Sequence, residues 1–124
     1  MVELKKYLDR LPEGYVQATE EELLSENPEI ILSPEDDCGL FFEVRPKVYE
    51  GHYLFASKGK AAVSSAKYIL NEMFKKAEVI IGETPISNLA ARKLSLSLGF
   101  KSYGRVWTPI EDCELFILTR KEYE

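Results

Sequence analysis

The sequence predicts a single α/β domain, spanning 1–124, that is built on one mixed sheet of about six to seven strands with flanking helices. Two observations lead to this expectation. Residues 48–82 show the order strand, glycine turn, helix and strand, which is typical of a crossover between neighbouring parallel strands. Strand-forming runs precede this unit, and a helix with two further strands follows it. A chain of 124 residues is long enough to bury one core.

Composition excludes several classes of protein. Apolar residues make up 45% of the chain and aromatic residues 11%, as in ordinary globular proteins. The net charge of −5 argues against nucleic acid as a partner. No apolar stretch is long enough to span a membrane, and the N-terminus lacks the apolar block of a signal peptide, so we expect a cytoplasmic protein. Cys38 and Cys113 match no metal-ligand spacing, and we expect reduced thiols and no metal site.

The N-terminal third predicts two short helices and a strand. Residues 2–11 carry apolar side chains at helical spacing, and Pro12 ends that pattern. A short extended piece is expected at 15–17. Thr19 and Glu22 form a capping-box pattern that begins a second helix reaching Ser25. Residues 29–33 are a short apolar run that favours a strand.

Two sheet-forming runs, 39–45 and 48–56, come next and are expected to pair antiparallel. In the second run, alternation places Glu50 and His52 on one face and Tyr49, Tyr53 and Phe55 on the other. Glu50 and His52 are the candidate acid–base pair of the chain. An exposed strand face that tolerates polar side chains is the alternative.

The second half alternates helices and strands. The helix 60–75 has one apolar stripe, made of Ala62, Ala66, Ile69, Leu70, Met73 and Phe74. Residues 77–82 are expected to form a buried parallel strand. The helix 88–98 follows, with Leu89, Leu94 and Leu98 facing inward and Gly99 at its end. Residues 101–106 and 113–119 predict a pair of strands around the Pro109 loop.

The turn at 57–60 is a candidate anion site. Lys58, Gly59 and Lys60 stand where the strand gives way to the helix. Backbone N–H groups at the start of a helix lack internal partners, and the helix dipole favours an anion there. A phosphate or pyrophosphate would suit this position. An ordinary connection with solvated lysines is the alternative.

The segment TPISNLAARKLSLSLGF, residues 84–100, resembles the acetyl-CoA-binding helix of the GNAT superfamily of N-acetyltransferases. The family typically shows Asn, then Ala three residues later, and a closing Gly-Phe pair, which here are Asn88, Ala91, Gly99 and Phe100. Residues 58–63 stand where the family has its pyrophosphate loop, commonly Arg-Gly-Lys-Gly-x-Gly. The order of strands also agrees from 29 onward. The resemblance covers most of the chain, with an N-terminal region shorter than the family's usual opening.

The resemblance implies a cofactor site for acetyl-CoA. Backbone amides from 59 to 63 would hold the pyrophosphate, backbone groups around 54–56 would pair with the pantetheine arm, and Asn88 would reach that arm. The implied cofactor-binding residues are Leu54, Phe55, Ala56, Lys58, Gly59, Lys60, Ala61, Ala62, Val63, Asn88 and Arg92. In catalysis an amine would attack the thioester directly, with Glu50 or His52 as base and Ser95 near the thiol.

Three positions depart from the family pattern. The second and third glycines of the loop are Ala61 and Val63 here. A second register, Ala56-x-x-Gly59-x-Ala61, also fits the loop, but it puts Ser64 and Ser65 on the core stripe of the helix, so we prefer the first register. Many members carry a tyrosine general acid seven residues after the Asn, where this chain has Ser95, a poorer proton donor.

The sequence therefore supports two functional hypotheses. The first is an acetyl-CoA-dependent N-acyltransferase that acetylates an amine of a small molecule or protein. The acid-rich segment 1–37 suggests a cationic acceptor, and Tyr49, Tyr103 and Trp107 are candidates to line its pocket. The second is a GNAT-fold binding or assembly protein without turnover, similar to small phage-encoded GNAT-like proteins. A homodimer is possible under either hypothesis, and no membrane partner is expected.

Overall fold

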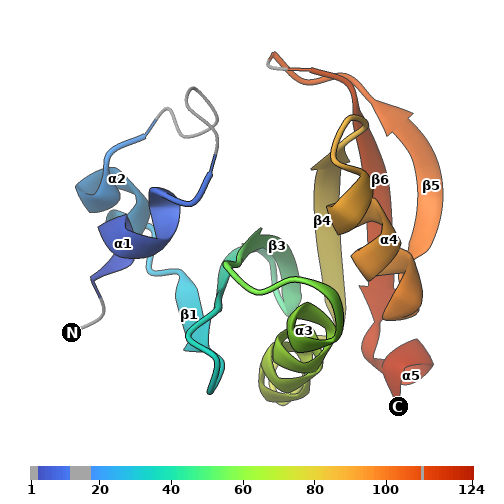
Figure 1. The fold of residues 1–124 in the computed structure, drawn as a ribbon, viewed down its shortest axis with the longest axis horizontal. Coiled ribbons are helices and arrows are strands. Elements are labelled where there is room, and N and C mark those ends of the chain that lie inside the picture. Colours follow the sequence, from blue (N-terminus) through green and yellow to red (C-terminus); the bar gives the residue numbers. More distant parts are fainter. Residues whose placement is uncertain (1–2, 12–17, 110) are drawn as a thin grey trace.

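A six-stranded mixed sheet forms the centre of the computed structural model, which describes residues 3–11, 18–109 and 111–124 (Figure 1). The strands follow the order β1-β2-β3-β4-β6-β5 across the sheet. Their bounds are Glu29–Leu32 (β1), Cys38–Arg45 (β2), Val48–Leu54 (β3), Val79–Pro85 (β4), Lys101–Val106 (β5) and Cys113–Thr119 (β6). The predicted fold class is confirmed. The extended piece expected at 15–17 lies outside the described residues.

Strand directions agree with the sequence prediction. As expected, the pairs β2–β3 and β5–β6 are antiparallel, and β3 lies parallel to β4. β1 pairs antiparallel with β2, a pairing for which no direction was predicted. The helix that joins β3 to β4 packs on one face of the sheet (Figure 1). β6 pairs antiparallel with β4, which places β4 between β3 and β6.

The helices are Leu4–Leu8 (α1), Glu20–Ser25 (α2), Gly59–Met73 (α3), Leu89–Ser97 (α4) and Arg120–Tyr123 (α5). The capping box predicted at α2 is present, with Thr19 accepting from the Glu22 amide. The sequence analysis missed α5. Thr119 and Glu122 form a second capping box there, so the same pattern that found α2 would have found this turn.

Two clusters of buried side chains cover opposite faces of the sheet. The larger contains Phe41, Tyr49, Ile80, Phe116 and Leu118 from the strands, together with the inward stripe of α3. All six residues predicted for that stripe are buried. The smaller cluster joins α1 to the other face through Leu4, Tyr7, Cys38, Leu40 and Leu54. Alternation along β2 and β3 accounts for the division.

The prediction for the inward face of α4 was wrong at Leu89, whose side chain is exposed, whereas Leu98 is buried. The two positions are nine residues apart, or about two and a half helical turns, so they lie on opposite sides of the helix. The inward face instead carries Ala91 and Ser95, which line the cavity described below.

β3 and β4 separate after a short paired stretch. Their register comprises Val48–Val79, Tyr49–Ile80 and Glu50–Ile81 only. Beyond Glu50, β3 stays paired with β2, and beyond Ile81, β4 stays paired with β6. The sheet therefore has a gap between two parallel strands, where backbone groups on both facing edges lack a strand partner.

Of the element boundaries that differ from the expected ones, three have clear local causes. The amide of Ala77 donates to the Met73 carbonyl at the end of α3, so β4 begins at Val79 rather than at 77. β4 continues to Pro85 because it pairs with β6 as far as Cys113. β3 ends at Leu54, since the Ala56 amide donates to a side chain instead of a neighbouring strand.

Candidate functional site

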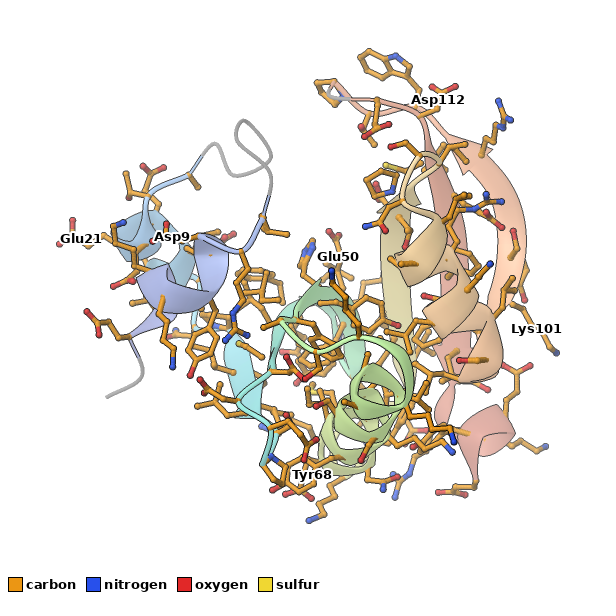
Figure 2. The ribbon with its side chains drawn as sticks, viewed as in Figure 1. Asp9, Glu21, Glu50, Tyr68, Lys101 and Asp112 are labelled. Atoms are coloured by element: carbon orange, nitrogen blue, oxygen red, sulfur yellow. The ribbon has the colours of Figure 1, made fainter. Side chains whose placement is uncertain are left out.

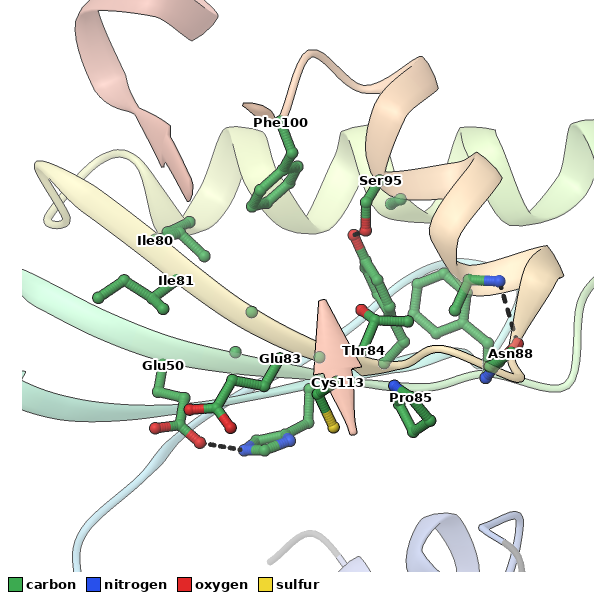
Figure 3. Close-up of a pocket in the computed structure, with 18 of the residues that line it drawn as sticks. Glu50, Ile80, Ile81, Glu83, Thr84, Pro85, Asn88, Ser95, Phe100 and Cys113 are labelled. Atoms are coloured by element: carbon green, nitrogen blue, oxygen red, sulfur yellow. Dashed lines mark hydrogen bonds and ion pairs between the residues drawn. The ribbon is translucent and has the colours of Figure 1, made fainter. Parts of the chain in front are cut away.

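A cavity of about 560 Å³ lies where β3 and β4 separate (Figure 3). Both strands, α3, α4 and the loop between β5 and β6 contribute to its wall. Of the residues predicted to act in catalysis or cofactor binding, five line it: Glu50, His52, Phe55, Asn88 and Ser95.

Residues from both faces of the sheet line the cavity. Tyr53, Ile80 and Thr84 belong to the face on which α3 and α4 pack. Glu50, His52 and Glu83 belong to the opposite face, because Glu50 is paired with Ile81 and Glu83 lies two residues beyond Ile81. The cavity thus passes through the gap between β3 and β4. One face of the sheet lines it with Glu50, His52 and Glu83, and the other with Tyr53, Ile80 and Thr84.

Glu50 and His52 form the acid–base pair that the sequence suggested. The Nε2 atom of His52 lies 3.3 Å from Glu50 Oε1. The hydrogen bond with His52 lowers the pKa of Glu50 below its usual range, although partial burial opposes this effect. Figure 3 shows the pair with the carboxylate of Glu83 directed to the same part of the cavity. Sequence reasoning missed Glu83, which follows the strand as it was predicted, 77–82.

A second pair of polar side chains lies on the helix-covered face. The hydroxyl of Tyr53 is 3.2 Å from that of Ser95, and both residues line the cavity. Burial raises the pKa of Tyr53 to about 12, although the Ser95 hydrogen bond opposes the rise. The phenol is therefore protonated near neutral pH. Sequence reasoning assigned Tyr53 to this face but gave it no role.

Asp37 fixes the loop between β3 and α3. Its Oδ1 accepts from the amides of Ala56, at 2.7 Å, and Ser57, at 3.0 Å, while its Oδ2 accepts from Ser65 of α3 at 2.6 Å. The side chain is fully buried. Burial would raise the pKa of Asp37, but hydrogen bonds from Ser57, Ser65 and the two amides lower it. No sequence signal marked Asp37, which lies at the end of a turn.

Ser65 also changes the comparison of the two loop registers. It is fully buried yet hydrogen-bonded to Asp37, Glu35 and Ser33. Ser64 is exposed. The burial of a serine on the core stripe is therefore no objection to the register Ala56-x-x-Gly59-x-Ala61.

The first turn of α3 presents open amides. No side chain among the described residues caps it, and Gly59, the first residue, has a φ of +58°, which favours glycine. Amides 58–61 precede the helical hydrogen-bond ladder. The Ala62 amide already donates to the Lys58 carbonyl at 3.5 Å, and Val63 lies one residue deeper in the helix. Of the amides predicted to hold a pyrophosphate, 59–63, those at 59–61 therefore remain open, whereas the Ala62 amide is already used within the helix.

Lys58 and Lys60 are exposed beside these amides. Neither lysine forms an ion pair within the described part of the chain. They and Ala61 do not line the cavity, which lies beyond this turn. Two positive side chains and the open end of a helix make this turn the more electropositive side of the site.

Asn88 and Arg92 on α4 have partners of their own. Asn88 caps α4 by accepting from the Ala91 amide at 3.1 Å, which leaves its side-chain NH₂ available in the cavity. The Nε atom of Arg92 lies 2.6 Å from Oε1 of Glu114, a buried carboxylate of β6. Arg92 is therefore bound to the sheet and does not line the cavity.

Two of the backbone groups expected to meet a pantetheine arm are engaged within the protein. The Leu54 carbonyl accepts from Arg10 Nη1 at 2.9 Å, and the Ala56 amide is held by Asp37. Phe55 remains at the cavity wall, with its ring in edge contact with Tyr53. Beyond Glu50, the edge of β3 that faces the gap, at 51–53, has no strand partner among the described residues.

Tyr49, Tyr103 and Trp107 do not line the cavity, although they were candidates for an acceptor pocket. Tyr49 is buried in the larger core cluster, whereas Tyr103 and Trp107 are 61% and 79% exposed.

Neither cysteine forms a disulfide, and burial raises the pKa of Cys38 to about 11. Among the described residues, no His, Cys, Asp and Glu side chains cluster as a metal site would require. No helix in that part of the chain has the length and hydropathy needed to cross a membrane.

Comparisons with known proteins identify the fold. No family model and no curated protein matches the amino-acid sequence. Among solved structures, aminoglycoside N-acetyltransferase AAC(6')-Ib11 has a TM-score of 0.70 and 18% identity, with 98% of this chain and 91% of that chain covered. For yncA, a putative acetyltransferase from Salmonella typhimurium with acetyl-CoA, the TM-score is 0.63, the identity 19% and the coverage 84% and 71%. AAC(6')-Ib in complex with ribostamycin and coenzyme A has a TM-score of 0.63 and 21% identity, with 82% of this chain and 70% of that chain covered.

Two other structures of similar fold are longer. The chain spans 54% of an uncharacterised protein from Bacillus halodurans and 56% of a ribosomal-protein-S5-alanine acetyltransferase from Vibrio fischeri. At these levels of identity the likeness concerns the arrangement of elements. The fold of this protein is that of the GNAT-type acetyltransferases.

Proposed function

We propose that the protein is an acetyl-CoA-dependent N-acyltransferase that acetylates an amine. The observation that carries the proposal is the cavity through the β3–β4 gap, which has an acid–base pair on one face and a phenol–hydroxyl pair on the other. Neighbours of the same fold are complexed with acetyl-CoA or coenzyme A. The arrangement suits a thioester that enters from the helix-covered face and an amine that enters from the other.

The residues present fit the cofactor in three respects. Open amides at 58–61, with Lys58 and Lys60 beside them, suit a pyrophosphate. The unpaired edge of β3 suits the amide groups of a pantetheine arm, which would add to the sheet like a strand. The free NH₂ of Asn88 can donate to the same arm from α4. When bound, acetyl-CoA would supply an activated acyl group.

The chain's own residues would then accept one proton and donate another. The Glu50–His52 pair accepts the proton that the attacking amine must lose, directly or through water. On the other face, Tyr53 donates a hydrogen bond to the departing sulfur and supplies its proton, with Ser95 holding the phenol in place. Tyr53 thus takes over the role that the sequence pattern assigned to the position of Ser95.

Binding and turnover test this proposal separately. Acetyl-CoA should raise the melting temperature and give heat in a calorimetric titration of the purified chain, because a ligand that binds only the folded state stabilises it. Amine-dependent release of free thiol should follow in a panel of primary amines. The double variant Glu50→Ala, His52→Ala should bind acetyl-CoA and release thiol slowly.

Two outcomes would contradict the proposal. Absence of both the thermal shift and the binding heat at millimolar acetyl-CoA would remove the cofactor. Binding without thiol release by any amine would favour the alternative, a GNAT-fold binding or assembly protein.

A further inference from the structure

The charged residues of the cavity wall all carry one sign. Glu50, Glu83 and Glu111 contribute carboxylates, and the described lining residues include no lysine or arginine. Glu50 is engaged with His52, and Glu111 accepts from Ser87. Glu83 is exposed and forms no ion pair or hydrogen bond with the described residues, so its charge faces the cavity unneutralised.

The electropositive part of the site lies elsewhere. Lys58 and Lys60 stand at the start of α3, outside the cavity wall, where an anionic cofactor would be attracted. The acids of the N-terminal helices, Asp9 and Glu21 among them, also lie apart from Glu50 (Figure 2). The acidity of the cavity thus comes from β3, β4 and the β5–β6 loop, and Glu50 and Glu83 lie on the face that also carries His52.

We infer that the acceptor is an amine that carries a second positive charge, and that Glu83 binds this charge. The inference rests on the proposed N-acyltransferase function. The register places Glu83 two residues beyond the partner of Glu50, which is about 6.6 Å along the strand. A short alkyl chain can therefore place one amine at the Glu50–His52 pair and an ammonium group at Glu83. A carboxylate at that end of the acceptor would be repelled.

Three acceptors of equal chain length test the inference. Pentylamine, 1,5-diaminopentane and 5-aminopentanoate present the same reacting amine with a neutral, positive or negative far end. We expect kcat/KM for thiol release to be about tenfold higher for the diamine than for pentylamine at about 50 mM salt. Of this ratio, a factor of two reflects the two reactive ends of the diamine. Pentylamine should in turn exceed aminopentanoate.

Glu83→Gln should lower the diamine-to-pentylamine ratio to about two, and Glu83→Lys should reverse the order of the diamine and aminopentanoate. Glu78→Gln is the matched control, because Glu78 precedes the same strand, is exposed and pairs with Arg120 outside the cavity. This control should keep the wild-type ratio. High salt should reduce the ratio in the wild type, because ions screen a partly exposed pair.

A wild-type ratio of two or less, or an unchanged ratio in Glu83→Gln, would overturn the inference while leaving the acetyltransferase proposal intact. Calorimetric titration of each amine into coenzyme A-saturated protein gives a readout without turnover. Tighter binding of the diamine that is lost in Glu83→Gln supports the inference even when no thiol is released. Equal binding of the three compounds, or binding of none, contradicts it.

Discussion

The hydroxyl of Tyr53 lies 3.2 Å from that of Ser95 in the cavity, so these two side chains are the candidates for the proposed general acid. An aliphatic hydroxyl is a much weaker acid than a phenol, even one whose pKa is raised to about 12 by burial. Ser95 is therefore better suited to orient Tyr53 than to donate the proton itself.

Tyr53→Phe should lower kcat about a hundredfold, since it removes the proposed general acid but keeps the ring contact with Phe55. Acetyl-CoA affinity, measured by calorimetry, should change little. Tyr103→Phe is the matched control on an exposed position, and its kcat should equal that of the wild type. Full activity in Tyr53→Phe would exclude Tyr53 as the acid.

Asp37→Asn should lower the free energy of unfolding by about 2 kcal/mol at neutral pH, because two amides and Ser65 lose a charged acceptor. The folded-state pKa of Asp37 lies below its ordinary value of 3.8, so its contribution is present above that pH and is lost as pH falls through the folded-state value. Urea unfolding should therefore show the difference between wild type and variant shrinking below pH 3.8. Asp9→Asn, in an exposed ion pair, should cost less than about 0.5 kcal/mol.

At the scale of elements, two glycines flank the gap and differ in their surroundings. A Cβ added at Gly51 of β3 would lie 2.7 Å from the Phe41 ring, whereas one added at Gly82 of β4 would meet nothing within 4 Å. Phe41 is buried between the sheet and α3, so its ring has little room to move. Beside the gap, the backbone of β3 at Gly51 is therefore closely packed, whereas the backbone of β4 at Gly82 is not.

Gly51→Ala should lower the free energy of unfolding by about 2 kcal/mol, through overpacking against Phe41. Gly82→Ala is the control for strand backbone effects and should be close to neutral in the same urea titration. Equal effects of the two substitutions would show that Phe41 relaxes without cost.

The first turn of α3 is positioned by the loop that joins it to β3. Its first amides have no partner within the helix, and no side chain in the described part of the chain caps them. Gly59, the first residue of the helix, adopts a left-handed φ, which favours glycine. Asp37 then holds the preceding two residues, Ala56 and Ser57, so that the turn has a fixed position relative to β3.

At the scale of the whole molecule, the sheet has a buried cluster on each face. Leu4 is fully buried in the smaller one, together with Leu54 of β3. Arg10 extends the contact by donating to the Leu54 carbonyl. The N-terminal helix therefore packs on the face of β3 to which Glu50 and His52 also belong.

Leu4→Ala should lower the free energy of unfolding of the whole molecule by about 3 kcal/mol, as expected for a cavity in a shared core. Fluorescence and far-UV circular dichroism should report one coincident urea transition. Leu96→Ala, at a side chain that is 55% exposed, should change stability by less than about 0.5 kcal/mol. Two separate transitions would show instead that α1 and α2 unfold independently of the sheet.

Local patterns in the sequence predicted most of the elements. Alternation separated the two faces of β3, helical spacing identified the buried stripe of α3, and Thr19 with Glu22 marked the start of α2. These signals depend on neighbours within a few residues, so they can be read from the chain. The same reasoning failed at Leu89, where the residue type was considered without its phase around the helix.

Only the tertiary structure determined the composition of the candidate site. The Glu50–His52 pair was predictable because both residues lie on one strand. Asp37 with Ser57 and Ser65, Tyr53 with Ser95, and Arg92 with Glu114 are contacts between residues 20 to 42 positions apart. Glu83 reaches the cavity because of the register of β3 with β4. Such contacts follow from how strands pair and helices pack, which no local pattern of residues specifies.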